Sequence, residues 1–123
     1  MSDLTTTIDT YLAAWNETDP ARRAELVEAV WNDDGRLIDP PLAAEGREGI
    51  SGMAEAMHQH YPGHTFRRVS AVDAHHDQLR FAWELVGPDG VVAITGLDTG
   101  EIGADGKLAR ITGFFGEIEP AEA

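Results

Sequence analysis

The two halves of this 123-residue sequence carry different hydrophobic periodicities. In the first half, apolar side chains recur every three or four residues, as at Ile8, Leu12 and Trp15, and this spacing forms one face of a helix. In the second half, apolar and polar residues alternate, as around Phe81 and Trp83, and this spacing forms one face of a strand. A chain with helices first and a run of strands afterwards is expected to fold as an α+β domain.

Capping and turn residues locate the boundaries of these elements. Asp19-Pro20 is typical of a helix N-cap followed by proline in the first turn. The Asp-Gly pairs at 89–90 and 105–106 are typical of turns between antiparallel strands. We predict one domain over residues 1–123, with a curved antiparallel sheet around three N-terminal helices. The predicted helices cover residues 3–18, 20–31 and 47–60, a loop covers 40–46, and the strands cover 35–39, 65–76, 79–86, 91–102 and 107–118.

Charge and composition exclude several classes of function. The formal net charge is −13 with only nine basic residues, so nucleic acid and anionic membranes would be repelled. Cysteine is absent, which excludes disulfides, a thiol nucleophile and a cysteine zinc site. The first seven residues lack the regions of a signal peptide, and no apolar run approaches the ~20 residues that span a bilayer. We therefore expect a cytoplasmic protein.

The five histidines do not form a metal-binding pattern. Three lie at 58, 60 and 64 and two at 75 and 76, and no acidic residue joins them at ligand spacing. Residues two apart on a helix also point in different directions. We expect no metal and no other cofactor.

Asp39 ends a short apolar strand and is followed at once by Pro40 and Pro41. Proline fixes the backbone, so the carboxylate would be held rigidly at the mouth of a pocket, where a general base is useful. The alternative is a structural aspartate that accepts backbone N–H bonds and shapes the turn.

Asp98 lies among apolar residues of a later strand. Gly96 and Gly100 share its predicted strand face, which leaves room for another group against that face. A buried carboxylate must be hydrogen-bonded or protonated, because burying the bare charge costs several kcal/mol. Two acids in apolar surroundings indicate a small-molecule site.

Seven short motifs follow one another along nearly the whole chain. They are YLAAW at 11–15, WNDDG at 31–35, IDP at 38–40, GREGI at 46–50, GLD at 96–98, DGKL at 105–108 and TGFF at 112–115. Their order and spacing resemble the nuclear-transport-factor-2-like superfamily, in its SnoaL-like polyketide-cyclase and ketosteroid-isomerase branch. The resemblance implies a cone-shaped α+β barrel with a deep interior pocket, usually as a homodimer.

The resemblance also implies roles for three residues. Ketosteroid isomerases use an aspartate base, together with a tyrosine and a protonated aspartate that stabilise a dienolate. Matching the motifs places Asp39 at the base, Tyr11 at the tyrosine and Asp98 at the protonated acid. The segment 17–23 is longer than in those enzymes, and Pro41 and the glycines beside Asp98 change the shape of the site. Steroid specificity is therefore not implied.

The epoxide-hydrolase branch of the superfamily fits less well. Its Asp-Arg-Asp set requires an acid on the final strand, but residues 110–115 contain none. Glu84 would offer an acid from a neighbouring strand, but it shares a predicted face with Arg80 and is expected to form an ion pair with it.

Two hypotheses of function follow. The first is a cofactor-independent isomerase, or a cyclase-like or dehydratase-like lyase, that acts on a small, mostly apolar carbonyl compound. The second is a non-catalytic ligand-binding or structural homodimer, in which Tyr11 is a core residue and Asp98 a structural acid. In both, some of the following side chains would contact a ligand, although their spacing also fits a plain core: Trp15, Met53, Met57, Phe66, Phe81, Trp83 and Phe115.

Overall fold

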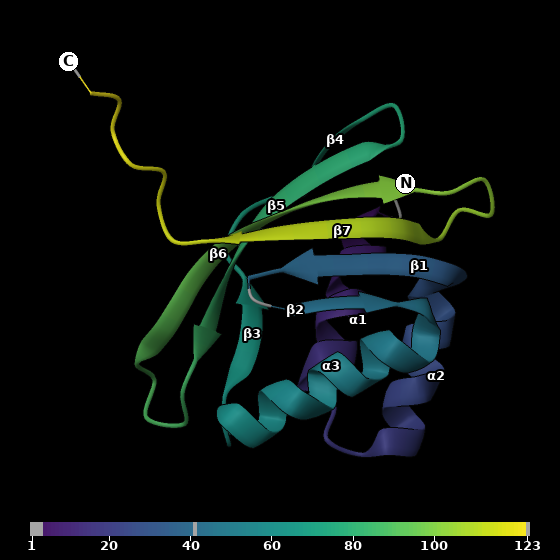
Figure 1. Ribbon diagram of the computed structural model, residues 1–123, viewed down its shortest axis with the longest axis horizontal. Coiled ribbons are helices and arrows are strands. Elements are labelled where there is room, and N and C mark those ends of the chain that lie inside the picture. Colours follow the sequence, from purple (N-terminus) through teal and green to yellow (C-terminus); the bar gives the residue numbers. More distant parts are fainter. Residues whose placement is uncertain (1–3, 41, 123) are drawn as a thin grey trace.

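A computed structural model describes residues 4–40 and 42–122 and confirms the α+β class. Three helices lie on one side of a curved, unclosed sheet (Figure 1). The helices are α1 (Leu4–Asn16), α2 (Pro20–Val30) and α3 (Gly46–His60). The strands are β1 (Trp31–Asp39), β2 (Leu42–Glu45), β3 (Thr65–Arg68), β4 (Asp73–His75), β5 (Gln78–Val86), β6 (Val92–Ile102) and β7 (Leu108–Phe115). Residue 3, where the first helix was predicted to begin, and Pro41 lie outside the described residues.

The sheet is mixed rather than wholly antiparallel. Its strand order is β2-β1-β7-β6-β5-β3, and β4 pairs with β5 beyond the end of β3. All pairs are antiparallel except β1 with β7, which is parallel. These two strands are not joined by a hairpin, so no turn sequence dictates their relative direction. This parallel pair lays the end of β1 beside the second half of β7.

Two differences from the predicted strands come from local contacts. The predicted strand 65–76 is two strands, because the Ser70 hydroxyl accepts the Ala82 N–H at 2.8 Å and replaces a backbone partner there. The segment 31–34, predicted as helix end and turn, belongs to β1, with a bulge between Trp31 and Arg36. Gly35 permits this bulge, because a Cβ there would collide with the Trp31 ring.

The loop predicted over 40–46 contains the short edge strand β2, which pairs antiparallel with β1. Two elements were predicted to extend too far toward the C-terminus. The helix predicted to end at residue 18 stops at Asn16 (α1), and the strand predicted to end at residue 118 stops at Phe115 (β7). Such terminal differences of a few residues are usual when boundaries are inferred from pattern alone.

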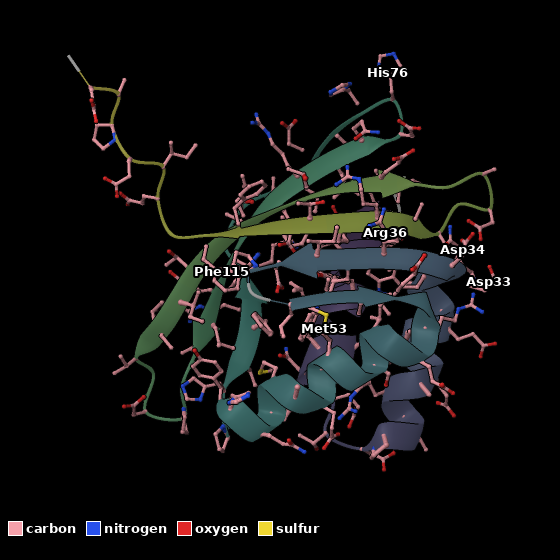
Figure 2. All side chains as sticks on the ribbon, viewed as in Figure 1. Asp33, Asp34, Arg36, Met53, His76 and Phe115 are labelled. Atoms are coloured by element: carbon pink, nitrogen blue, oxygen red, sulfur yellow. The ribbon has the colours of Figure 1, made fainter. Side chains whose placement is uncertain are left out.

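The core lies between the helices and the concave face of the sheet. Its most deeply buried large side chains are Trp31, Phe81, Ile8, Leu37, Leu85, Leu108 and Ile111. Met53 faces this core from α3, whereas Asp33, Asp34 and His76 lie at the outer edges of the molecule (Figure 2). The predicted N-cap also forms, because the Asp19 side chain accepts the Arg22 N–H at 2.9 Å. The helices therefore pack against the concave face of the sheet and bury one continuous core.

Candidate functional site

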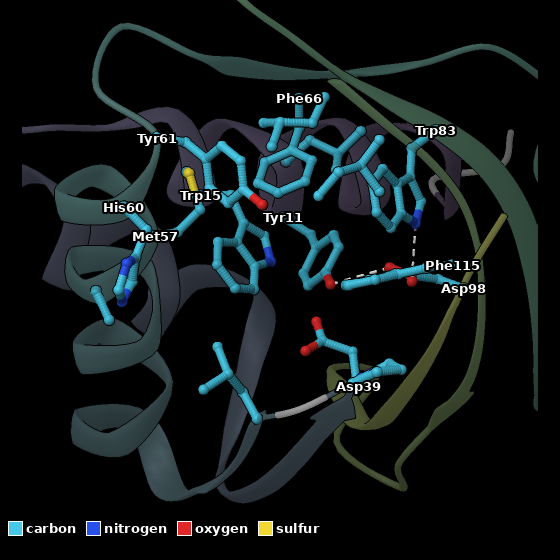
Figure 3. Close-up of a pocket in the computed structure, with 16 residues that line it drawn as sticks. Tyr11, Trp15, Asp39, Met57, His60, Tyr61, Phe66, Trp83, Asp98 and Phe115 are labelled. Carbon is cyan, nitrogen blue, oxygen red and sulfur yellow. Dashed lines mark hydrogen bonds between the residues drawn. The ribbon is translucent and has the colours of Figure 1, made fainter. Parts of the chain in front are cut away.

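A cavity of about 480 Å³ lies between α1, the end of α3 and the concave face of the sheet (Figure 3). Its volume is in the usual range for small-molecule sites. The lining is mostly apolar and aromatic, with two carboxyl groups on the sheet side. The lining residues are Tyr11, Leu12, Trp15, Asp39, Pro40, Leu42, Ala56, Met57, His60, Tyr61, Phe66, Trp83, Leu85, Ile94, Asp98 and Phe115.

Most of the predicted apolar residues border this cavity, and two do not. Met53 is buried one helical turn before Met57 and packs in the core instead. Phe81 lies two residues before Trp83 on the same strand face and packs edge-on against Tyr11, with ring centroids 6.1 Å apart. Both therefore belong to the core rather than to the lining of the cavity.

Sequence reasoning missed several lining residues near the end of α3 and in the loop before it. His60 and Tyr61 follow Met57 at three- and four-residue spacing, so extending the apolar face of α3 by one turn would have found them. Leu42 lies in the unpredicted strand β2, and no local pattern marks it.

Asp98 is buried in the middle of β6, where its side chain accepts two hydrogen bonds. The Trp83 indole N–H donates to Oδ1 at 2.9 Å, and the Tyr11 hydroxyl donates to Oδ2 at 3.0 Å (Figure 3). Only 5% of the residue is exposed. Burial raises the pKa of Asp98 to about 7, although both hydrogen bonds act in the opposite direction, and the nearby Asp39 adds a smaller increase.

The two donors to Asp98 determine where its proton sits when it is neutral. An indole nitrogen can only donate, so Oδ1 must remain an acceptor, and the proton must be on Oδ2. The protonated acid then donates to the Tyr11 oxygen, and the Tyr11 O–H becomes free to donate into the cavity. When Asp98 is ionised, the Tyr11 O–H is instead directed at Asp98. Burial, followed by the charge of Asp98, also raises the pKa of Tyr11, so the phenol itself stays protonated.

Asp39 is held differently, at the end of β1. It is half-buried, and neither of its carboxyl oxygens has a hydrogen-bond or ion-pair partner within residues 4–40 and 42–122. Oδ1 is shielded from solvent as well as unpartnered. Desolvation raises the pKa of Asp39 to about 6. An ionised Asp39 is thus a base with free acceptor capacity.

Gly113 on β7 brings the two acids together. Asp98 is its direct partner across β6 and β7, and on the other side Ile38 pairs with Thr112, which places Asp39 next to Gly113. A Cβ on Gly113 would lie 2.8 Å from Asp98 Oδ1 and 3.9 Å from Asp39 Oδ2. These two oxygens can therefore be no further apart than the sum of those distances. The glycine leaves the space into which both carboxyl groups turn.

The glycines beside Asp98 on its own strand leave room for other groups, as predicted, and those groups are side chains of the protein itself. The Trp83 ring fills the space over Gly96, where a Cβ would collide with it. Ile111 and Leu79 fill the space over Gly100, at 2.8 and 3.2 Å from a Cβ there. Gly96 thus makes room for the Trp83 indole that donates to Asp98, and Gly113 makes room for the two carboxyl groups.

The other polar candidates lie outside the cavity. Glu84 pairs with Arg67 at 2.7 Å and Arg80 pairs with Asp73 at 2.8 Å, so the predicted Arg80–Glu84 pair was wrong. His58 contacts the Trp15 carbonyl oxygen at 2.7 Å. Among the residues the structure describes, no three His, Cys, Asp or Glu side chains form a group that could hold a metal ion. Within the same residues, no helix has the length and apolar character needed to cross a membrane.

Comparison with solved structures shows the same fold in several bacterial proteins. A candidate isomerase of the SnoaL-like family from Agrobacterium tumefaciens is 38% identical with a TM-score of 0.87, over 91% of this chain and 96% of that one. A candidate SnoaL-like polyketide cyclase from Jannaschia sp. is 18% identical with a TM-score of 0.68, over 94% and 89% of the two chains.

A third structure, from Catenulispora acidiphila, is a protein with a ketosteroid-isomerase-like fold in complex with trimethylamine. It is 16% identical with a TM-score of 0.71, over 87% of this chain and 82% of that one. No curated protein matches the chain. The family model of the SnoaL-like domain matches residues 8–111, which is most of the sequence. The chain therefore belongs to the SnoaL-like domain family.

Proposed function

We propose that this protein is a cofactor-independent isomerase, or a related cyclase or dehydratase, that moves a proton next to the carbonyl group of a small, mostly apolar compound. The observation that carries the proposal is a carboxylate, Asp39, that has no partner among the described residues and lies beside a hydrogen-bonded acid and phenol in one apolar cavity. The relatives named as candidate isomerase and polyketide cyclase support the same class of chemistry.

In the proposed reaction, ionised Asp39 removes a proton from the carbon next to the carbonyl. The C–H electron pair forms the enolate double bond, and negative charge develops on the carbonyl oxygen. The Tyr11 O–H donates to that oxygen, while neutral Asp98 donates to Tyr11 and strengthens it as a donor. In a substrate with a carbon–carbon double bond beyond that carbon, the enolate extends into a dienolate, and Asp39 returns the proton to its far carbon, which completes an isomerisation. Otherwise the enolate expels a leaving group or attacks a second carbonyl, and Asp39 gives its proton to the leaving group or to the new alkoxide.

The two acids must be in opposite protonation states for this chemistry. Asp39 works when ionised, above a pKa of about 6, and Asp98 works when protonated, below a pKa of about 7. The rate should therefore pass through a narrow maximum near neutrality and fall on both sides. The two limbs belong to the interacting pair rather than to either residue alone.

Exchange of α-protons for solvent deuterium tests the proposal without knowledge of the natural substrate. Small enolisable ketones such as cyclohexanone and cyclohex-2-enone would be incubated in D2O with the wild type, Asp39→Asn and Asp73→Asn. Removing a general base should slow exchange by roughly 10²–10⁴-fold in Asp39→Asn. Asp73→Asn has the same change of charge at an exposed acid outside the cavity and should exchange like the wild type. Equal exchange in all three proteins would rule the proposal out.

A second function, ligand binding without chemistry, is favoured by one observation. Both oxygens of Asp98 already accept hydrogen bonds within the protein, as expected of a structural acid. In that case a ligand would be recovered unchanged from the cavity, and deuterium exchange would not exceed the rate in buffer. The trimethylamine complex of the Catenulispora protein supports small-molecule binding by this fold in either case.

We also propose that the protein forms a homodimer through the outer face of its sheet. The outer face of the sheet exposes Ile38, Leu97 and Phe114, and the last two are register partners on β6 and β7. Exposed apolar groups on adjacent strands are typical of an association surface. Light scattering should give the mass of a dimer for the wild type and of a monomer for Phe114→Lys. A monomeric wild type at high concentration would contradict this part.

A further inference from the structure

We propose that the cavity selects ligands by charge, and that it binds a compound carrying a protonated amine more tightly than its neutral or anionic counterpart, with the Asp39 carboxylate as counter-ion. The inference rests on the proposed function in treating Asp39 as an ionised, ligand-facing group. It concerns binding, so it can be tested without turnover.

None of the nine basic residues lines the cavity, although all nine lie within the described residues. Six of them pair with acidic side chains that are not part of the lining. Arg47 and Lys107 donate to the backbone carbonyls of Trp31 and Glu28, and Arg36 is exposed on β1. No Lys or Arg is therefore available to pair with an anionic ligand inside the cavity.

The titratable groups that surround the cavity with Asp39 are few. Tyr11 faces it from α1, His60 and Tyr61 from the end of α3, and Asp98 from β6. Asp98 already has both oxygens in hydrogen bonds, and the Tyr11 hydroxyl is bonded to Asp98. Asp39 is thus the carboxyl group in this set whose oxygens have no partner among the described residues.

An ionised carboxylate in apolar surroundings is costly unless an opposite charge or a donor reaches it. An ammonium group supplies both, because it is positively charged and its N–H groups donate to the carboxylate. A neutral alcohol of the same shape supplies a donor only. A carboxylate ligand would place like charges together in a site of low polarity. Six aromatic side chains in the same lining add surfaces that attract cations.

Benzylamine, benzyl alcohol and benzoate make a matched set of probes, because they share a ring and differ in charge. Their binding to the wild type would be measured by NMR or calorimetry at about pH 8 and about pH 5, on either side of the Asp39 pKa of about 6. At the higher pH, benzylammonium should bind about tenfold or more tighter than benzyl alcohol, and benzoate should bind weakest. At the lower pH, Asp39 and Asp98 are both mostly protonated, and the preference for the amine should shrink to within about threefold.

Two variants separate the cavity carboxylate from the overall negative charge of the protein. Asp98, with a pKa of about 7, is also ionised at the higher pH, but both of its oxygens accept hydrogen bonds within the protein. Asp39→Asn should therefore lose most of the preference for benzylammonium at that pH. Asp73→Asn, which removes the same charge from an exposed Arg80 pair, should keep it. Equal binding of benzylamine and benzyl alcohol to the wild type at the higher pH would overturn the inference. So would a preference that persists in Asp39→Asn, or the absence of binding by all three probes.

The outcomes also separate this inference from the proposed function. Charge preference without deuterium exchange would support the inference and contradict the enzyme. Deuterium exchange that depends on Asp39, with equal binding of amine and alcohol, would support the enzyme and contradict the inference.

Discussion

The end of β1 and the middle of β6 each place an aspartate beside the same glycine, yet the two sites are built differently. At the end of β1, Asp39 is half-buried and has no partner among the described residues. In the middle of β6, Asp98 is buried and accepts hydrogen bonds from Trp83 and Tyr11. Desolvation is the largest cause of the raised pKa in both.

This difference shows that a raised pKa alone does not assign a role to a buried acid. Burial makes both carboxyl groups costly to ionise, but hydrogen bonding decides which of them is available to a ligand. The oxygens of Asp98 are committed to the protein, whereas those of Asp39 can accept a proton or a donor from outside. In the proposed function, the partners of each acid, rather than its pKa, therefore distinguish the base from the group that supports a donor.

The largest expected effect is on the free energy of unfolding, and it tests whether Asp98 is the more strongly desolvated of the two acids. Its folded pKa of about 7 lies above its unfolded value near 3.8, so its contribution to stability is fully present below about pH 4 and is lost as the pH rises through about 7. Asn in place of Asp cannot ionise and still offers an acceptor to Trp83. Relative to wild type, Asp98→Asn should therefore gain about 4 kcal/mol in free energy of unfolding between about pH 4 and pH 8.

Urea unfolding of both proteins across this pH range measures the difference. The same measurement on Asp39→Asn should show a change of the same sign but smaller, because Asp39 is partly exposed to water. A difference between wild type and Asp98→Asn that does not vary with pH would show that Asp98 is not a desolvated acid.

The next largest effect is expected on the rate of deuterium exchange, from a substitution that fills the space between the two acids. Gly113→Ala places a Cβ 2.8 Å from Asp98 Oδ1 and 3.0 Å from Asp39 Cβ, so at least one acid must move. Displacement of catalytic groups by about 1 Å can cost about 10²-fold in rate, and we expect deuterium exchange to fall by about that factor. Gly52→Ala is the matched control, because among the described residues only its own helix backbone and chain neighbours come near a Cβ there, and Ala favours the helix α3. Full activity in Gly113→Ala would show that the acids need not converge on this glycine.

The smallest expected effect is on the pKa of Asp98, and it tests the hydrogen bond that the Trp83 indole donates. Trp83→Phe removes the N–H that Asp98 Oδ1 accepts, so it should raise the pKa of Asp98 further and cost about 1–3 kcal/mol of stability. Carbon-13 NMR titration of the side-chain carboxyl groups would report the pKa. Ile94→Val shortens another side chain of the same lining that has no polar atom, and it should leave this pKa in place. An Asp98 that titrates alike in wild type and Trp83→Phe would contradict the hydrogen bond.

Much of the fold and part of the site could be predicted from the sequence. The three helices and the family were predicted correctly, because periodicity and capping are local signals. Asp39 and Asp98 were singled out by their apolar surroundings in the sequence, and Tyr11 and the roles of all three by the resemblance. All three border one cavity, although their roles stay predictions. Met53 was misplaced because helical spacing shows that a residue faces inward but not whether core or cavity lies there.

The sequence by itself determined which residues alternate toward the interior of each helix and strand, since that depends on backbone geometry and on the pattern of apolar side chains. Only the tertiary structure decided which inward residues meet. The parallel pairing of β1 with β7 sets Asp39 beside Gly113, and the packing of α1 against the sheet brings Tyr11 to Asp98. These contacts join segments far apart in the chain, and no turn or repeat in the sequence encodes their register. The same pairings place Trp83 over Gly96 and leave space at Gly113. The difference between Asp39, which has no partner among the described residues, and Asp98, which is hydrogen-bonded, therefore depends on how the sheet is assembled.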